Sequence, residues 1–296
     1  MAGITVGFIG TGAMGEHMCR NIAQRSDKLV IAHDLNSDPL DRLAEHGVER
    51  ALDLDDIARR TDVTILSLPG GPEVEAVCEE KLYGTAREGW TVIDMSTTPV
   101  KLTRKVAARF AAKGTRFLDA PVARTQQAAI DGNLSIMVGG DVTVLDEVRD
   151  ILLCMGPEVN HCGPSGCGQI TKILNNMLVF QHGVALAEAL TIGEEAGMDP
   201  GHLLNIISKS SGASFVGQNH GRKAMVPRTF PLKQFPARYA LKDLSYALML
   251  AEDEGVQVPG ARLAGDILEK AINMGYGEEY WPTIINVVRR AMDKSE

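Results

Sequence analysis

The sequence has few cysteines and no arrangement of them that predicts a disulfide framework or a zinc site. Its five cysteines are an odd number and include no Cys-x-x-Cys pair, so we expect reduced, packed thiols in a cytoplasmic protein. The seven histidines are scattered and show no His-Glu-x-x-His spacing. We therefore expect no protein-bound metal.

A long hydrophobic run and a basic block are missing as well. The longest uncharged run, residues 173–187, contains two asparagines, a glutamine and a histidine and is too short to span a bilayer. Because it is apolar nearly all round, it predicts a helix buried between other elements or between subunits. We expect no signal peptide. With a net charge of −8, neither nucleic acid nor a membrane is an expected partner.

A glycine-rich segment near the start of the chain predicts a nucleotide site. An apolar run from Ile4 leads directly into Gly-x-Gly-x-x-Gly at Gly10, Gly12 and Gly15, and a helical pattern follows. In this arrangement Gly10 permits a tight turn, Gly12 lets the backbone approach a pyrophosphate, and Gly15 allows close helix–strand packing.

Asp34 ends the next apolar run, about 20 residues after the last glycine of the motif. A carboxylate there accepts hydrogen bonds from ribose hydroxyls and repels a 2′-phosphate, so the sequence favours NAD over NADP. The alternative is an ordinary turn or helix-capping aspartate, a role for which Asp38 is the better candidate. Both interpretations of Asp34 are compatible with the sequence.

A second glycine-rich segment, residues 163–176, carries the candidate chemistry. Lys172 and Asn176 are four residues apart, on one face of a predicted helix that begins just after the glycines. The helix dipole disfavours a cation near a helix N-terminus, which lowers the pKa of such a lysine and suits it to general acid–base work. The alternative is a surface lysine with a solvated head.

The rest of the sequence divides near residue 163. Before it, strand-like runs at residues 63–68, 91–94, 116–119, 134–138 and 159–162 alternate with amphipathic stretches such as 100–112 and 142–153. This alternation predicts a mostly parallel, doubly wound sheet. After it, helical patterns cover roughly residues 169–196, 200–208, 241–255 and 261–274, with a last helix from Pro282. The predicted domains are therefore residues 1–163, α/β and NAD-binding, and residues 164–296, all-α.

Four blocks of sequence, in this order, resemble the β-hydroxyacid dehydrogenase family typified by 3-hydroxyisobutyrate dehydrogenase. They are residues 7–15, 119–125, 163–176 and 242–247. The resemblance covers essentially the whole chain. It implies an N-terminal Rossmann domain, an all-α C-terminal domain, and hydride transfer between NAD and a short anionic hydroxy acid or its semialdehyde. It also implies a homodimer or homotetramer.

The resemblance assigns roles to individual positions. Lys172 corresponds to the catalytic lysine. The implied substrate-binding residues are Ser96, Asp119, Val122, Arg124, Thr125, Asn175, Asn176 and Lys242. The implied cofactor-binding residues are Gly10, Gly12, Ala13, Met14, Gly15, Asp34, Leu68, Pro69, Thr97 and Lys242.

The chain departs from the common family pattern at one point. Most members continue Asp-Ala-Pro-Val with Ser-Gly-Gly, whereas this chain has Ala123-Arg124-Thr125. A guanidinium is a fixed two-pronged donor that matches a multi-oxygen anion. The pattern is similar to that of the sulfolactaldehyde reductase (γ-hydroxybutyrate dehydrogenase) branch, which makes a sulfonate the most specific substrate hypothesis. A carboxylate substrate, or an arginine that pairs locally, is the alternative.

Two hypotheses from other classes share parts of these patterns. A non-catalytic NAD-binding module would share the first domain, but such proteins usually lose the lysine that is present here as Lys172. An imine reductase would share both domains, but typically carries aspartate or tyrosine at that position. Within the dehydrogenase class, 3-hydroxyisobutyrate, tartronate semialdehyde and succinate semialdehyde remain alternative substrates.

Overall fold

The computed structural model describes residues 3–232 and 234–290. The chain separates into two compact units, of which the first ends at Lys172 and the second begins at Ile173. The first unit reaches beyond residue 163 because backbone amides of residues 166–169 bond to a carboxylate on the sheet. The start of the helix that follows, α9 (Cys167–Glu195), therefore folds with the sheet.

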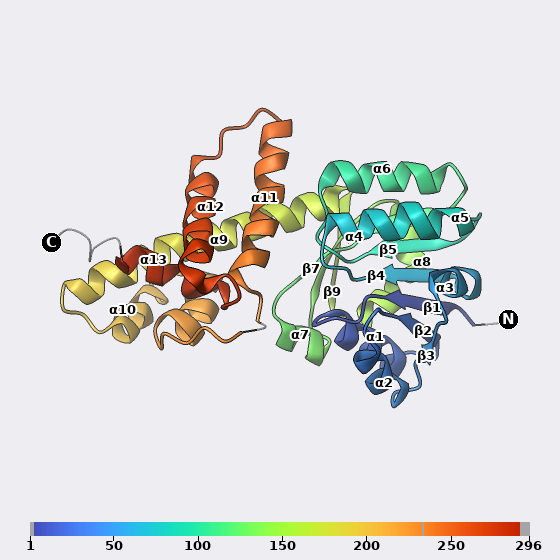
Figure 1. Ribbon diagram of the computed structural model, residues 1–296, viewed down its shortest axis with the longest axis horizontal. Coiled ribbons are helices and arrows are strands. Elements are labelled where there is room, and N and C mark those ends of the chain that lie inside the picture. The colour runs from blue at the N-terminus through green and yellow to red at the C-terminus, as the bar shows by residue number, and fades with distance from the viewer. Residues whose placement is uncertain (1–2, 233, 291–296) are drawn as a thin grey trace. The chain divides into compact units, whose positions relative to one another are not determined.

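The first unit is built on one twisted sheet (Figure 1). Its strand order is β3-β2-β1-β4-β5-β6-β8-β7, and β9 pairs with β8. The strands in the described residues are β1 (Thr5–Ile9), β2 (Leu29–His33), β3 (Glu49–Arg50), β4 (Val63–Leu66), β5 (Thr91–Asp94), β6 (Arg116–Asp119), β7 (Val122–Ala123), β8 (Ser135–Gly139) and β9 (Glu158–Gly163).

The sheet is parallel from β3 to β6, and then reverses direction. β8 runs antiparallel to both β6 and β7, whereas β9 runs parallel to β8. The prediction of a mostly parallel, doubly wound sheet is therefore confirmed. The central strands β4 and β5 are buried along their whole length, as expected where helices cover both faces of a parallel sheet.

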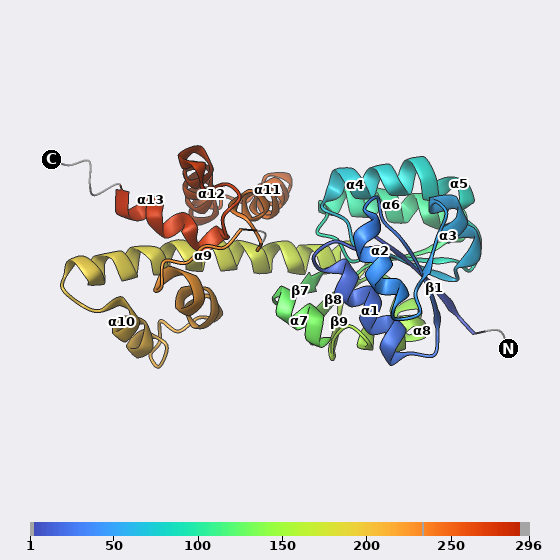
Figure 2. The ribbon, with the colours of Figure 1, turned by 60° about the horizontal axis from the view of Figure 1, so that its bottom comes forward.

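Helices cover both faces of this sheet, as Figures 1 and 2 show. One core contains apolar side chains of α1, α2, α7 and α8, and the other contains those of α3, α4 and α6. The helices of the unit are α1 (Gly15–Arg25), α2 (Ser37–Ala44), α3 (Leu54–Arg60), α4 (Gly71–Glu75), a π-helix (Ala76–Leu82), α5 (Tyr83–Thr85), α6 (Val100–Ala111), α7 (Gln126–Asp131) and α8 (Val142–Leu153).

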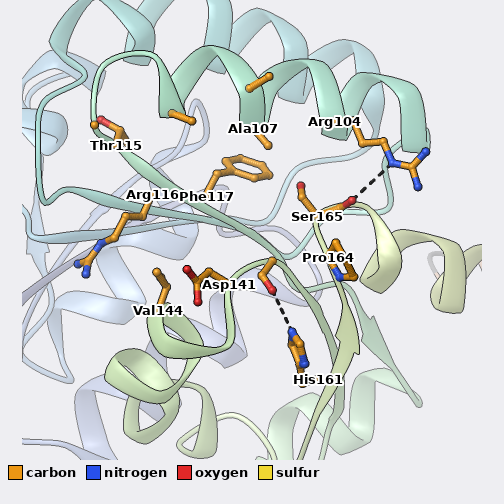
Figure 3. A pocket seen from close by; sticks show the side chains of 14 residues that line it. Arg104, Ala107, Thr115, Arg116, Phe117, Asp141, Val144, His161, Pro164 and Ser165 are labelled. Atoms are coloured by element: carbon orange, nitrogen blue, oxygen red, sulfur yellow. Dashed lines mark hydrogen bonds between the residues drawn. The ribbon is translucent and has the colours of Figure 1, made fainter.

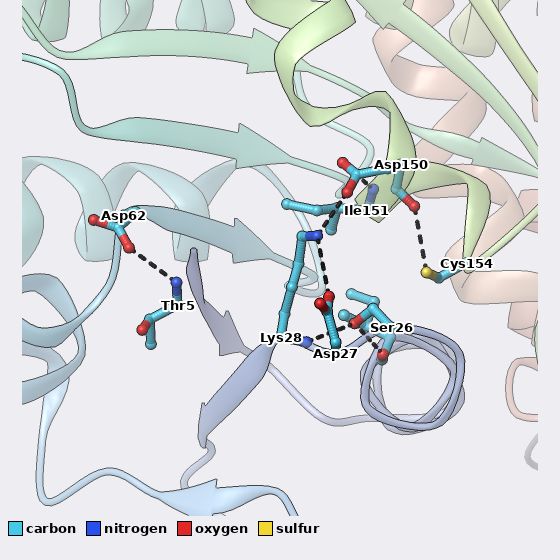
Figure 4. A network of polar contacts seen from close by, with 9 residues as sticks. Thr5, Ser26, Asp27, Lys28, Asp62, Asp150, Ile151 and Cys154 are labelled. Atoms are coloured by element: carbon cyan, nitrogen blue, oxygen red, sulfur yellow. Dashed lines mark hydrogen bonds and ion pairs between the residues drawn. The ribbon is translucent and has the colours of Figure 1, made fainter. Parts of the chain in front are cut away.

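A polar network joins the end of α1 to α8 (Figure 4). Lys28 Nζ lies 2.6 Å from Asp150 Oδ2, and the Cys154 thiol donates to the Asp150 carbonyl oxygen at 3.3 Å. Hydrogen bonding to Asp150 raises the pKa of Lys28. Because the Asp150 side chain is 61% exposed, we expect this ion pair to contribute little to stability.

Among the described residues, the regular secondary structure of the second unit is helical, apart from two isolated β-bridges. Its helices are the remainder of α9 (Cys167–Glu195), α10 (Pro200–Ile207), a π-helix (Gly217–Met225), α11 (Ala237–Asp253), α12 (Pro259–Ala271), a π-helix (Ile272–Tyr276), a 3₁₀-helix (Trp281–Ile284) and α13 (Ile285–Arg290). The predicted α/β and all-α organisation is thereby confirmed. The π-helix at Gly217–Met225 lies where no helix was predicted. The π-helix at Ile272–Tyr276 overlaps the end of the helix predicted at residues 261–274, because apolar periodicity does not distinguish π-helices from α-helices.

α9 is buried on one face only within this unit. Phe180 and Leu190 are buried, but Leu178 is 49% exposed and Ile192 is 66% exposed. The sequence predicted burial on all sides, between elements or between subunits, and within one chain that burial is incomplete. No helix in the described residues is both long enough and apolar enough to span a membrane. All five cysteines are free.

Candidate active site

In the turn between β1 and α1, two of the three glycines of the motif are required because other backbone atoms lie too close for a side chain. Gly10 has φ of +92°, and a Cβ there would lie 2.3 Å from the Ser67 carbonyl oxygen. A Cβ on Gly15 would lie 2.0 Å from the Gly10 carbonyl oxygen. Both positions therefore require glycine for the turn and for helix–strand packing.

At the position of Gly12, in contrast, packing does not require a glycine. Among the described residues, no atom comes within 4 Å of a Cβ built on Gly12. Gly12 and Ala13 are exposed, and Met14 at the cap position of α1 makes no side-chain hydrogen bond to the helix start in this part of the structure. The positive end of the helix dipole thus faces open space, which fits the pyrophosphate of a dinucleotide.

Asp34 lies beside this turn, at the end of β2. Its Oδ2 accepts from the Thr11 backbone N–H at 2.5 Å, and its Oδ1 accepts from the Asn36 N–H at 2.8 Å. The carboxylate is therefore fixed next to the glycine turn, where the ribose of a bound dinucleotide is expected. The expectation that Asp38 caps a helix is wrong, because Asn36 is the cap of α2 and its side chain accepts from the Asp38 N–H.

The segments after β4 and β5 carry the other predicted cofactor contacts. Leu68 is half-buried, Pro69 is exposed and Thr97 is half-buried. The Leu68 N–H donates to Ser96 Oγ at 2.8 Å, which ties the two segments together. These residues follow the carboxyl ends of β4, which pairs with β1, and of β5, the next strand in the sheet. The carboxyl ends of the strands are where ligands of doubly wound sheets bind.

Ser96 was predicted to contact substrate, but it is only 4% exposed. Its hydroxyl accepts from Leu68 N–H and hydrogen-bonds to the Asp94 carboxylate. This placement favours a role in fixing the two segments over a direct substrate contact.

Asp119, also predicted to bind substrate, is fully buried and caps the start of α9. Its carboxylate accepts from the Gly166 N–H at 2.7 Å and the Gln169 N–H at 2.9 Å. A Cβ on Gly139 or Gly168 would lie within 3 Å of the same carboxylate, so glycines make room for it. Burial raises the pKa of Asp119, and the backbone hydrogen bonds oppose this effect. Asp119 therefore holds the start of α9, and its contact with substrate stays a prediction.

Two buried residues around this point escaped the sequence analysis. Asp94 pairs in register with Asp119 on the neighbouring strand, and burial raises its pKa to about 6. Gln169 is fully buried and bonds to the segment after β5. A signal for Asp94 existed, because two predicted strands each end in aspartate and parallel strands end at the same edge. No sequence signal specified the partners of Gln169.

Lys172 and Asn176 lie one helical turn apart in α9, as predicted. Lys172 is half-buried and Asn176 is buried. In the second unit, Asn176 Nδ2 donates to Asp243 Oδ2 at 2.8 Å, and Lys242 Nζ lies 3.1 Å from Asp243 Oδ1. The structure thus brings together Asn176 and Lys242, two predicted substrate ligands, through one buried carboxylate. Asn175 is adjacent, and its Nδ2 donates to Asn176 Oδ1 at 3.3 Å.

The other predicted substrate ligands of the block at residues 119–125 differ in their surroundings. Val122 is half-buried in β7, and Thr125 caps α7 through the Ala128 N–H. Arg124 donates to the Asn133 carbonyl oxygen at 2.8 Å and to Glu158 Oε1 at 2.5 Å. Its backbone has φ of +88°, a conformation that favours glycine. In this structure the guanidinium is engaged by the protein itself.

A groove of about 810 Å³ lies along α6 and β6 of the first unit (Figure 3). None of the predicted site residues lines it. Its charged side chains contact the protein itself: Arg116 pairs with Glu147, Asp141 caps α8 through the Thr143 N–H, and Arg104 donates to the Ser165 carbonyl oxygen at 3.5 Å. The dinucleotide turn and the start of α9, rather than this groove, hold the candidate chemistry. No cluster of metal-ligating side chains occurs in the described ranges.

Known proteins resemble the chain over nearly its whole length. A family model for the NAD-binding domain of 6-phosphogluconate dehydrogenase matches residues 5–163. A second model, described as NAD-binding of NADP-dependent 3-hydroxyisobutyrate dehydrogenase, matches residues 166–288.

Individual relatives agree with these matches. The chain is 32% identical to 2-(hydroxymethyl)glutarate dehydrogenase of Eubacterium barkeri, over 96% of this chain and 94% of the relative. It is 29% identical to the NAD-dependent L-serine dehydrogenase of Pseudomonas aeruginosa, over 98% of each. The structure of Mycobacterium tuberculosis 3-hydroxyisobutyrate dehydrogenase with L-serine matches with a TM-score of 0.88 at 28% identity, covering 97% of this chain and all of that one. The chain therefore belongs to the 3-hydroxyisobutyrate dehydrogenase-like family of β-hydroxyacid dehydrogenases and is an NAD-dependent hydroxyacid dehydrogenase.

Proposed function

We propose that the protein interconverts a short anionic 3- or 4-hydroxy acid and its semialdehyde, with Lys172 as the general acid–base. The observation that carries this proposal is the placement of Lys172 one turn from Asn176 in a helix whose start is anchored on the sheet by Asp119. The same sheet carries the open glycine turn at α1. Together, these features supply a cofactor-binding turn and a fixed proton-transferring group.

The proposed chemistry needs one proton transfer by the protein. In oxidation, neutral Lys172 Nζ accepts the proton of the substrate hydroxyl as the carbon that bears it loses a hydride. In reduction, the ammonium form donates that proton to the carbonyl oxygen and stabilises its developing negative charge. The glycine turn at Gly10–Gly15 and Asp34 would hold NAD, which when bound would supply the hydride acceptor in oxidation and, as NADH, the hydride donor in reduction. Asn175, Asn176 and Lys242 are the proposed substrate ligands.

The names of the relatives support a substrate with a primary hydroxyl. 3-Hydroxyisobutyrate, L-serine and 2-(hydroxymethyl)glutarate each place a CH₂OH group on the carbon next to a carboxylate. We propose that the substrate of this protein also reacts at a primary hydroxyl, or at the corresponding aldehyde, and is anchored by an acidic group one or two carbons further along. 3-Hydroxyisobutyrate, tartronate semialdehyde and succinate semialdehyde are alternatives within this class.

Arg124 favours a second, more specific candidate, 3-sulfolactaldehyde. An arginine at φ of +88° is strained by about 1 kcal/mol or more, and such strain is often found at ligand-binding loops. Its guanidinium would exchange Glu158 for the three oxygens of a sulfonate. The present pairing of Arg124 with Glu158 and Asn133 is the competing explanation.

A substrate panel followed at 340 nm with NADH tests these proposals. The panel contains sulfolactaldehyde and the methylmalonate, tartronate and succinate semialdehydes. We expect the highest kcat/KM with sulfolactaldehyde. A wide advantage for methylmalonate or tartronate semialdehyde would remove the sulfonate proposal and leave the hydroxyacid one. No reduction of any member would favour a non-catalytic NAD-binding module.

Variants of Arg124 separate its two possible roles. If it binds the anionic group, Arg124→Gly raises KM and also lowers kcat, because remote binding energy orients the reacting carbon. Arg124→Lys rescues only partly, because an ammonium cannot make the planar two-pronged contact. Glu158→Gln, which removes the charge of the present partner, serves as the matched control. Unchanged KM in Arg124→Gly would show that the arginine only pairs locally.

A further inference from the structure

The side chain of Gln169 joins the first turn of α9 to the segment that follows β5. Its Oε1 accepts from the Thr98 backbone N–H at 3.0 Å, and its Nε2 donates to the Ser96 carbonyl oxygen at 2.8 Å. Its own backbone N–H donates to Asp119. One fully buried amide therefore satisfies the main chain on both sides of Thr97.

The Ser96–Thr98 segment is also held from its other sides. Ser96 Oγ accepts the Leu68 N–H at 2.8 Å, and Thr98 Oγ1 donates to Asp94 Oδ2 at 2.9 Å. Thr97 lies between these anchors and is half-buried. The segment after β4, the segment after β5 and the helix turn before Lys172 are thus parts of one continuous hydrogen-bond network.

We propose that Gln169 is a positioning residue for hydride transfer. Its amide sets the Ser96–Thr98 segment at a fixed place relative to the turn of α9 that precedes Lys172, three residues further on. This inference rests on the proposed function, in which Thr97 contacts the cofactor and Lys172 transfers the proton. Misplacement of reacting groups by about 1 Å reduces rates by about a hundredfold, so a clamp of this kind affects turnover more than binding.

The chemistry of the clamp is specific to a primary amide. It needs one acceptor for Thr98 N–H and one donor for the Ser96 carbonyl, and only glutamine offers both at this length. Methionine has similar length but neither strong group. A glutamate carboxyl group offers both only while it is protonated, and the buried carboxylates Asp94 of β5 and Asp119 of β6 disfavour its ionised form, whereas Lys172 of the same helix favours it.

Amide hydrogen exchange in the protein without cofactor tests the clamp directly. In the wild type, we expect the Thr98 N–H to be protected from exchange. In Gln169→Met, its exchange accelerates at least tenfold relative to the wild type. Thr64→Val is the matched control, because Thr64 is also a fully buried polar residue, but its hydroxyl bonds to Thr61 and to the Trp90 ring N–H. In that variant, the Thr98 N–H should still exchange no faster than global unfolding of the variant allows.

Kinetics then test positioning. We expect Gln169→Met to lower kcat at least tenfold, with KM for NADH and the NADH dissociation constant changed less than threefold. In Gln169→Glu, the ratio of variant to wild-type kcat should be higher at pH 5.5 than at pH 8, because protonation restores the donor. Thr64→Val should retain wild-type kcat.

Several results would overturn the inference. They are an unchanged Thr98 exchange rate in Gln169→Met, a wild-type kcat despite faster exchange, or an equal loss of kcat in Thr64→Val. If the wild type transfers no hydride to any substrate, the proposed function fails, and with it the positioning role. The clamp itself is still decided by the Thr98 exchange rate.

Discussion

Two glycine-rich helix starts in the first unit, those of α1 and α9, have opposite surroundings. The start of α1 has no side-chain cap among the described residues, and Gly12 faces open space. The start of α9 is closed by the buried carboxylate of Asp119, which accepts two of its backbone N–H groups. A glycine-rich helix start is therefore an anion site only where the protein leaves its amides unsatisfied.

This difference changes the argument for Lys172. The sequence suggested that the positive end of the α9 dipole disfavours the ammonium form of this lysine. Asp119 already meets that end of the helix, and its carboxylate opposes the dipole. The helix dipole therefore gives weaker support to the proposed role of Lys172 than the sequence alone suggested.

Substitutions of the glycines at the start of α1 are expected to have the largest effect on cofactor binding. Gly15→Ala places a Cβ 2.0 Å from the Gly10 carbonyl oxygen, so we expect loss of NADH binding together with a lower melting temperature. Gly12→Ala is the matched control, because its Cβ meets no described atom within 4 Å. We expect it to keep the melting temperature and to weaken NADH binding at least tenfold in a fluorescence titration. Unchanged binding in Gly12→Ala would mean that the open space is not the cofactor's.

Removal of the carboxylate that caps α9 is expected to have the second-largest effect, a loss of folding stability. Asp119→Ala leaves buried backbone N–H groups unpaired, and we expect the free energy of unfolding to fall by about 3 kcal/mol in urea denaturation. Asp62→Ala removes a more exposed carboxylate that accepts one backbone N–H, from Thr5, and should lower it by about 1 kcal/mol or less. Equal effects of the two variants would contradict a special role for the buried cap.

The neighbouring Asp94 gives a pH-dependent effect. Burial raises its pKa to about 6, above the ordinary value of about 3.9 that the unfolded chain has. Its contribution to stability is therefore complete below the pKa of the unfolded chain and is lost as the pH rises through the pKa of the folded protein. The difference in unfolding free energy between wild type and Asp94→Asn should fall by about 2 kcal/mol from pH 4 to pH 7. A difference that grows with pH would contradict this assignment.

Asp34 is expected to give the smallest effect. Asp34→Ala removes the acceptor beside the glycine turn, and we expect NAD binding to weaken by about tenfold, or about 1.4 kcal/mol. NADP binding should weaken less, because the charge that repels a 2′-phosphate is removed too. Dissociation constants for both cofactors provide the measurement. A wild-type preference for NADPH would show that Asp34 does not select the cofactor.

The sequence was informative where local chemistry determines structure. Short apolar runs predicted β1, β2, β4, β5 and β6, but not β3, whose two residues are charged and exposed. The spacing of Gly10, Gly12 and Gly15 predicted the turn that the structure contains. These features depend on residues close together in the chain. The same is true of the lysine and asparagine one turn apart in α9.

The roles of Asp119, Ser96 and Gln169 depend on contacts between residues far apart in the sequence. Asp119 contacts an amide 50 residues later, and Gln169 contacts a carbonyl 73 residues earlier. The direction of β8, antiparallel to β6, is likewise not encoded in its own apolar pattern. Family resemblance predicts Ser96 and Asp119 as substrate ligands, and this stays a prediction. The structure adds that both residues are buried and hydrogen-bonded to neighbouring segments.

Hydride transfer in Lys172→Ala, measured in a single turnover alongside NADH titration, tests the central claim most directly. If the cofactor binds at the open start of α1 and Lys172 transfers the proton, the NADH dissociation constant should stay within about threefold of the wild-type value. The rate of hydride transfer should fall by about 10² to 10⁴-fold. A near-wild-type rate would remove Lys172 from the mechanism, and a loss of NADH binding equal to the loss of rate would make it a cofactor ligand instead.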